Sequence, residues 1–183
     1  MWMKTEFTFL GKCDIICNIE AKGGLCMKEN KQRSIMPGWN SPKYEPLDWE
    51  ECLGAGCYPY ALGLKVNQFF VVGDIIGKHC NNNVSDDYLI DVLKEEIEFI
   101  LDCVVEEVET DIILEEGERL IYIQREEHTG YYHFLRQDDN GMWSHKYPNE
   151  LPTNRDSAGV IIEDPDSMVE APFYGWCLLI KEH

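Results

Sequence analysis

The strongest pattern in the chain is a helical repeat of apolar residues that begins after Ser85. Apolar side chains recur every three or four positions from 89 to 108, and acidic residues fill the positions between them. This spacing gives a helix one apolar face, and Ser85 followed by acidic residues is typical of a helix N-terminus. The sequence therefore predicts an amphipathic helix over 85–109, of roughly five to six turns, packed on a sheet.

From residue 118 onward the pattern changes to short runs rich in β-branched and aromatic residues. Three such runs, 118–126, 131–137 and 142–146, are separated by the turn-forming sequences EHTG and DDNG, and a fourth run covers 173–181. Consecutive runs joined by tight turns are typical of antiparallel strands. The order of elements predicts an α+β protein with an antiparallel β-meander or barrel-like sheet.

The first 50 residues differ from this core. Residues 1–27 contain short β-prone runs around a KGG turn, which indicates a small hairpin, and residues 28–50 are polar and rich in Pro, Gly and Asn, as in a surface loop. We therefore expect an N-terminal extension over 1–50, packed on a single core domain over 51–183.

Composition and charge limit the classes of partner and the cellular location that fit this chain. The formal net charge of -18 argues against binding to nucleic acid and favours a basic protein partner or simple solubility. No stretch has membrane-spanning length, and the N-terminus lacks the apolar core and cleavage site of a signal peptide. We expect a cytoplasmic protein that reaches the outside only by another route, such as a phage, a secretion system or a larger precursor.

The eight cysteines have irregular spacing, and several lie within apolar runs. This distribution is typical of reduced, buried thiols rather than of a disulfide scaffold. Cys13, Cys17 and Cys26 lack paired C-x-x-C spacing, and no H-E-x-x-H motif occurs. The sequence therefore predicts neither a metal site nor a cofactor.

Cys57 differs from the other cysteines in its local sequence, GAGCYPYALGL. Two glycines precede it, and Pro59 is compatible with the first turn of a helix because the missing N–H would be unpaired there. The pattern predicts that Cys57 opens a helix, where partial positive charge favours the thiolate. His79, in GKHCNNN, is interpreted as a loop residue.

Two histidines, His133 and His145, flank the DDNG turn. A three-residue loop, at either 138–140 or 139–141 with Gly141 left-handed, would place both rings on the same face, directly opposite or diagonal to each other. A two-residue loop would place them on opposite faces. Contact between the two rings therefore requires a loop of odd length.

Together these residues suggest a nucleophile, a base and an orienting group: Cys57, His133 and His145. Gln137, Asp138 and Asn154 are alternatives for the third position. Side chains near these positions are candidates for contacting a substrate, although cross-strand aromatic packing also explains most of them; they are Tyr58, Tyr132, Arg136 and Trp143.

A cysteine that opens a helix, followed by a meander with one histidine in its second strand and another twelve residues on, resembles the NlpC/P60 branch of papain-like cysteine hydrolases. The run EEGERLIYIQ at 115–124 also resembles the Pro-Gly-Asp-Leu-like turn that precedes the first histidine strand in that family. The resemblance covers roughly 50–147 and treats the helix at 85–109 as an insertion.

This resemblance implies a papain-like fold and a cofactor-free cysteine peptidase or amidase. Cys57 would be the nucleophile, His133 the general base and His145 the orienting residue, acting through an acyl-thioenzyme on a cell-wall or other peptide. Related folds also host thiol acyltransferases and deamidases. A further alternative is a non-catalytic interaction module on the same fold, which binds a basic protein through its acidic helix.

Overall fold

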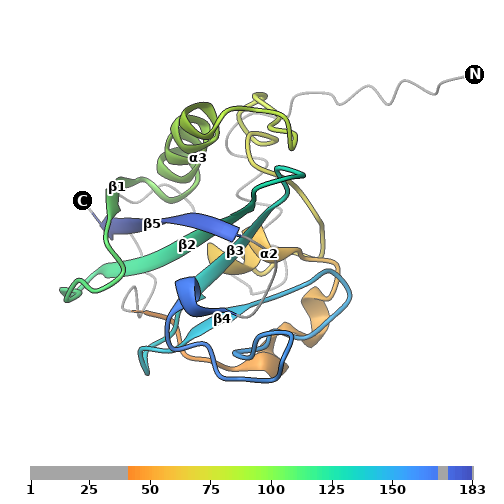
Figure 1. Cartoon of the computed structure of the whole chain (residues 1–183), viewed down its shortest axis with the longest axis vertical. Helices are drawn as coiled ribbons and strands as arrows, with labels where there is room; N and C mark the ends of the chain where they lie inside the picture. The colour runs from red at the N-terminus through yellow and green to blue at the C-terminus, as the bar shows by residue number, and fades with distance from the viewer. Residues whose placement is uncertain (1–40, 169–172, 183) are drawn as a thin grey trace, which may run out of the picture. The chain divides into compact units, whose positions relative to one another are not determined.

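The computed structural model describes residues 41–168 and 173–182, which all belong to the unit that runs from Met36 to His183 (Figure 1). The predicted hairpin at 1–27 and most of the predicted loop at 28–50 lie outside these residues. At residues 46–50, where a loop was expected, the chain forms the first turn of a 3-10 helix, η1, over Pro46–Cys52.

The core is one antiparallel sheet of five strands in the order β1-β5-β2-β3-β4. The strands are β1 (Cys103–Val108), β2 (Glu118–Glu126), β3 (Tyr132–Gln137), β4 (Trp143–His145) and β5 (Phe173–Glu182). The predicted α+β class is confirmed, as are the consecutive pairs β2–β3 and β3–β4. The last strand, β5, lies between β1 and β2.

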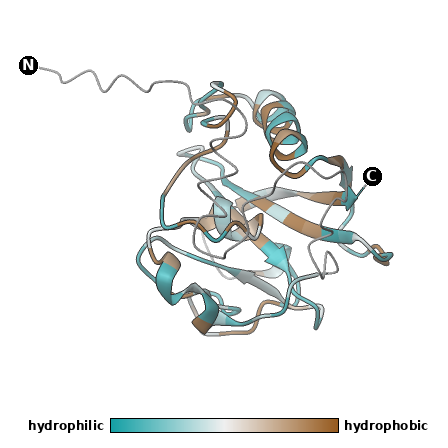
Figure 2. Ribbon diagram, turned by 180° about the vertical axis from the view of Figure 1, so that it is seen from behind, coloured by the Kyte–Doolittle hydropathy of each residue, from teal (hydrophilic) through white to brown (hydrophobic). Residues whose placement is uncertain are grey.

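The amphipathic helix is α3, over Asp86–Leu101, and its predicted start is confirmed because the Ser85 side chain accepts a hydrogen bond from the Tyr88 N–H. Figure 2 shows hydrophilic and hydrophobic residues on different sides of α3. The predicted end at 109 is wrong. Asp102 adopts a left-handed conformation with φ +50° and stops the helix, and residues Cys103–Val108 form the edge strand β1 instead.

The remaining helices are short: α2 (Cys57–Ala61) and the 3-10 helix η2 (Pro165–Ser167). Within the described residues no helix is long and apolar enough to cross a membrane.

Side chains alternate along each strand, so the sheet has two apolar faces. The first face packs against α2 and α3 through residues such as Ile123, Phe134 and Leu178. The second face carries a smaller cluster that includes Tyr122, Leu135 and Trp143. The candidate site lies where α2 meets the edge of β3.

The turn between β3 and β4 follows one of the two predicted forms. Asp138 N–H donates to Met142 O at 2.8 Å, Gly141 N–H donates to Asp138 O at 2.9 Å, and Gly141 has φ +80°. The loop is therefore 139–141, with glycine at the left-handed position. Leu135 pairs with His145 in this register, so His133 and His145 lie diagonally across the two strands on one face.

Candidate active site

Cys57 is the first residue of α2, as predicted. Gly56 is the N-cap with extended backbone, and its carbonyl accepts the Tyr60 N–H at 3.3 Å. Pro59 occupies the first turn, where no hydrogen-bond donor is needed. The side chain of Cys57 is largely buried, with 8% of the residue exposed.

The Cys57 sulfur lies against the open edge of β3. Alternate N–H groups of an antiparallel strand point to the same neighbour, so Phe134, like Asp138, directs its N–H toward the β4 side. β4 pairs only with residues 135–137, so this N–H is left free at the edge. The Phe134 N–H lowers the pKa of the Cys57 thiol, so this N–H lies near the sulfur. The Cys57 sulfur is therefore near the residue that follows His133.

The two predicted histidines are in direct contact. His133 Nε2 and His145 Nδ1 are 2.8 Å apart, and His145 Nε2 is 3.0 Å from the backbone oxygen of Arg155. Backbone bonds in both directions between His145 and Thr153, each 2.9 Å long, fix the position of the second ring. Among the described residues no hydrogen bond joins the Cys57 sulfur to either ring.

The Arg155 carbonyl determines where the ring protons lie. A carbonyl only accepts, so His145 Nε2 carries a hydrogen, and if the ring carries this one hydrogen alone, its Nδ1 is an acceptor. The hydrogen between the two rings consequently belongs to His133 Nε2. This leaves His133 Nδ1 with a free lone pair, and Nδ1 is buried without a hydrogen-bond partner. An imidazole nitrogen with a lone pair and no hydrogen-bond partner can accept a proton.

Burial keeps both candidate groups neutral. His133 is 2% exposed and stacks on Tyr147 with ring centroids 4.7 Å apart. Desolvation, and then the neighbouring His145, lower the pKa of His133 to about 3, and desolvation raises the pKa of the Cys57 thiol to about 11. The resting pair is thus thiol and imidazole. The prediction that the helix N-terminus favours the Cys57 thiolate is wrong, because desolvation outweighs the N–H groups and the charge near the sulfur.

Lys146 is a buried cation behind Cys57. Its Nζ donates to Leu53 O at 2.9 Å, Ala55 O at 2.5 Å and Tyr147 O at 3.2 Å, and the residue is 0% exposed. Its three donors are matched by three carbonyls, which fixes the loop that leads into α2. Its charge also lowers the pKa of the Cys57 thiol, although less than burial raises it.

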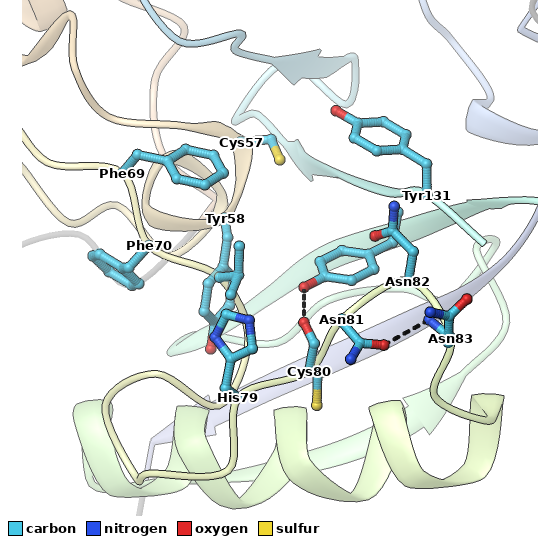
Figure 3. Close-up of a pocket in the computed structure, with 12 residues that line it drawn as sticks. Cys57, Tyr58, Phe69, Phe70, His79, Cys80, Asn81, Asn82, Asn83 and Tyr131 are labelled. Carbon is cyan, nitrogen blue, oxygen red and sulfur yellow. Dashed lines mark hydrogen bonds between the residues drawn. The ribbon is translucent and has the colours of Figure 1, made fainter. Parts of the chain in front are cut away.

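A cleft of about 460 Å³ opens at Cys57 (Figure 3). Phe69 and Phe70 contribute to one side, and Tyr131 and the asparagines at 81–83 to the other. Figure 3 shows the Cys57 sulfur between Phe69 and Tyr131, whereas the sulfur of Cys80 points away from the opening toward α3. Of these two thiols, Cys57 is the one that faces the cleft.

A buried carboxylate fixes one wall of the cleft. Glu96 of α3 is 0% exposed and accepts hydrogen bonds from Tyr58 Oη at 2.7 Å and from the N–H groups of Gly73 and Ile75, both at 2.8 Å. It therefore ties α2 and the loop after Phe70 to α3.

A buried guanidinium fixes the opposite wall. Arg125 of β2 donates to Asp86 Oδ1 at 2.6 Å, Val84 O at 2.6 Å and Asn82 O at 3.1 Å. A Cβ on Gly130 would overlap the Asn82 carbonyl, so a glycine is required where this loop meets the β2–β3 turn. Both walls are thus positioned by buried charged groups and do not depend on a ligand.

His79, interpreted from the sequence as a loop residue, also lines the cleft. Its Nδ1 lies 2.5 Å from Asp74 Oδ1, and the other oxygen of Asp74 accepts the Val71 N–H at 2.9 Å. The His79 side chain is 63% exposed. His79 is therefore an oriented imidazole that lines the cleft, whereas His133 and His145 are not among the residues that line it.

The residues predicted to contact a substrate separate into two pairs. Tyr58 and Tyr132 line the cleft, although each hydroxyl is already bonded, to Glu96 and to Cys80 O respectively. Arg136 stacks on Tyr60 and pairs with Asp138, and Trp143 is buried in the cluster on the second face of the sheet. Neither Arg136 nor Trp143 lines the cleft, because Arg136 is engaged by Tyr60 of α2 and by Asp138, and Trp143 packs against Tyr122 on the second face of the sheet.

The alternatives for the orienting group have other partners. Asp138 pairs with Arg136, and the Gln137 amide donates to Gly141 O at 3.5 Å; for Asn154, between described residues, the bond is made by its backbone carbonyl, which accepts the Ile162 N–H. His145 is the group bonded to His133. Within the described part of the chain, no set of three or more His, Cys, Asp or Glu side chains is arranged to hold a metal.

Sequence reasoning missed Lys146, the Arg155 carbonyl and the role of Phe69. Lys146 carried no pattern beyond its place in WSHK, and a backbone carbonyl leaves no signal in a sequence. The two glycines before Cys57 were a usable signal for Phe69. A Cβ on Gly56 would lie 2.6 Å from the Phe69 ring, so the glycine permits the aromatic ring to cover that position.

No family model matches the chain, and no solved structure matches it. The chain is similar to "Insoluble matrix shell protein 1" of Ruditapes philippinarum, with 28% identity over 142 residues that cover 74% of this chain and 88% of that protein.

Proposed function

We propose that this protein is a papain-like cysteine hydrolase of the NlpC/P60 type, which cleaves an amide bond in a peptide-like substrate through an acyl-thioenzyme. The observation that carries the proposal is the buried His133 Nδ1, which has no hydrogen-bond partner and belongs to a chain of contacts from His133 to His145 to the Arg155 carbonyl. The N–H of the next residue, Phe134, lowers the pKa of the Cys57 thiol. In this assignment α3 is an insertion into the papain-like framework.

In the proposed reaction His133 Nδ1 takes the thiol proton as the Cys57 sulfur attacks the substrate carbonyl carbon. Backbone N–H groups beside the sulfur, including that of Cys57, stabilise the oxyanion. The C–N bond then breaks, and the leaving amine takes the proton from His133. His145 holds the ring of His133 in the required tautomer throughout.

Water, deprotonated by His133, then attacks the thioester carbon; the C–S bond breaks, the acid leaves, and the Cys57 sulfur takes the proton back from His133. A thiol acyltransferase would use an amine or alcohol acceptor at this step, and a deamidase would release ammonia from a side-chain amide in the first step. All three reactions need the same Cys57 and His133. The identity of the acceptor and leaving group distinguishes them.

The test uses p-nitrophenyl acetate, an activated ester that acylates a nucleophilic thiol. We expect a burst of p-nitrophenolate and an acetyl adduct that maps to Cys57 by mass spectrometry. Cys57→Ala should lose both signals, whereas Cys80→Ala, which changes a thiol in the cleft wall, should keep them.

A second measurement compares the thiols directly. Cys57 should react with chloroacetamide faster than the other cysteines near neutral pH. If Cys57 reacts no faster than they do, and Cys57→Ala leaves the acetyl adduct in place, the hydrolase proposal is wrong.

A second candidate function is a non-catalytic interaction module, which the similarity to a shell matrix protein favours. Asp87, Asp91, Glu95 and Glu98 are exposed and follow helical spacing along α3, so they form an acidic stripe. Such a stripe would suit a basic protein. The large negative charge of the whole chain makes nucleic acid an unsuitable partner.

This candidate is tested with a lysine-rich peptide as the probe. Binding should weaken as salt increases, and it should weaken further when Asp87, Asp91 and Glu98 are replaced by their amides. Glu95 is left unchanged because it pairs with Lys78. If binding is unaffected by salt and by the three substitutions, the acidic stripe is not a docking surface.

A further inference from the structure

The cleft at Cys57 contrasts in charge with the rest of the protein. The chain has 34 acidic and 16 basic residues, yet no Asp, Glu, Lys or Arg is among the described residues that line this cleft. The imidazole of His79 is at its edge and is already paired with Asp74. A charged substrate group would lose its hydration here without gaining a partner, which is unfavourable.

Two exposed aromatic rings flank the sulfur. Phe69 is 54% exposed and Tyr131 is 43% exposed, and Figure 3 shows them on opposite sides of Cys57. Phe69 packs on Gly56, the residue before the nucleophile. Both rings belong to a cleft whose lining is mainly apolar, so an apolar group bound there would be removed from water, and aromatic rings add favourable edge and face contacts to apolar burial.

The asparagine loop supplies uncharged hydrogen-bonding groups. The Asn81 side chain accepts the Asn83 N–H at 2.8 Å and thereby shapes the loop, and Arg125 holds the Asn82 carbonyl. No hydrogen bond between described residues engages the Asn82 amide. An amide side chain at this position can both donate to and accept from a peptide backbone.

We propose that the cleft selects an uncharged acyl group that carries an aromatic or large apolar side chain next to the scissile carbonyl, bound between Phe69 and Tyr131. This inference rests on the proposed function of Cys57. It distinguishes the substrate from acidic peptides, because a carboxylate beside the scissile carbonyl would meet two aromatic rings and no cation.

The test uses four acetyl-capped amino-acid chloromethyl ketones, with Phe, Ala, Glu or Lys side chains. The Cys57 sulfur forms a bond to the methylene carbon, chloride leaves, and the thiol proton passes to His133. Alkylation rates measured by intact mass are divided by the rate with chloroacetamide, which has no side chain. We expect the normalised rate for Phe to exceed those for Glu and Lys by tenfold or more, with Ala between.

Phe69→Ala and Tyr131→Ala should each reduce the ratio of the Phe rate to the Ala rate severalfold, and Phe69→Leu should reduce it less. Tyr88→Ala is the matched control, because Tyr88 is a similarly exposed aromatic residue on α3, outside the cleft. Equal rates for all four probes, or faster reaction with Glu or Lys, would overturn the inference.

The outcomes separate the two proposals. Fast chloroacetamide reaction at Cys57 without side-chain selection rejects the inference and leaves the hydrolase proposal intact. Slow reaction of Cys57 with every reagent, at the rate of the other thiols, rejects both.

Discussion

The described chain holds two oriented imidazoles near one thiol, and they differ in partner and in surroundings. His133 is buried and bonded to a second imidazole, that of His145, whereas His79 is mostly exposed and bonded to the carboxyl group of Asp74. Burial disfavours the charged form of a histidine, and the pKa of His133 is lowered accordingly. The buried arrangement therefore keeps His133 as a neutral ring.

The position of the free nitrogen also differs. In the His133 pair the free nitrogen is the buried Nδ1, near the strand edge that holds the Cys57 sulfur. In the His79 pair Asp74 occupies Nδ1, which leaves Nε2 at an exposed place in the cleft. A histidine paired with a carboxyl group, as His79 is with Asp74, is easy to recognise in a structure. Whether a ring can act as a base depends instead on the burial of its free nitrogen and on its tautomer.

The largest expected effect is on the chemistry of Cys57. His133→Gln should slow acetylation of Cys57 by p-nitrophenyl acetate by roughly 100- to 10,000-fold, because general base catalysis typically contributes this much. The burst of p-nitrophenolate measures the change. A loss below about threefold, with the variant folded by circular dichroism, would remove His133 from the mechanism.

The same residue should make the protein sensitive to acid. The pKa of His133 is about 3 in the folded protein, below the ordinary value of 6.5, so the unfolded chain binds a proton first as pH falls. The contribution of His133 to the free energy of unfolding is complete above pH 6.5 and is lost as the pH falls toward 3. The loss is on the order of several kcal/mol. Urea unfolding followed by tryptophan fluorescence at pH 7, 5 and 4 measures it, and His133→Gln should show a shallower decline.

His145→Ala should have an intermediate effect. Outer partners that orient a functional histidine typically contribute about 10- to 100-fold, and we expect a loss of that size in the acetylation rate. Nitrogen-15 NMR of the His133 ring supplies a readout that altered packing alone would not give: wild type should carry the proton on Nε2, and the variant should show both tautomers. An unchanged tautomer would mean that the Arg155 carbonyl and His145 do not determine it.

The smallest expected effect belongs to the exposed pair. His79→Gln and Asp74→Asn should change the acetylation rate by less than about threefold, since general base catalysis would contribute at least 100-fold. The same ester assay, run beside His133→Gln, provides the comparison. If His79→Gln lowers the acetylation rate more than His133→Gln does, the roles assigned to the two histidine pairs must be exchanged.

Much of the fold followed from periodicity because most elements bury one face against the core. The strands β2, β3 and β5 and the start of α3 at Ser85 were visible in the alternation of apolar residues and in the turn residues between them. The strand β1 was missed because the run CVVEEV continues the helical spacing. Its strand state depends on pairing with β5, about 70 positions later in the sequence, which no local pattern encodes.

The candidate site was partly predictable for a similar reason. The spacing of His133 and His145 about Gly141 was sufficient to predict their contact, because hairpin register follows from loop length. The tautomer of His133 depends on the backbone carbonyl of Arg155, which His145 contacts. The Lys146 ammonium is buried because it donates to three other backbone carbonyls. A sequence does not show which backbone carbonyl a side chain will contact, so these contacts could be found only in the structure.

The central place of β5 has a consequence for how the chain is made. β5 comes last among the strands but separates β1 from β2, and it pairs with both of them over most of its length. During synthesis β2, β3 and β4 can pair as they emerge, while β1 has no partner until residues beyond 173 have left the ribosome. Closure of the sheet is therefore a late, long-range step, and until then the exposed edges of β1 and β2 are open to pairing with other chains.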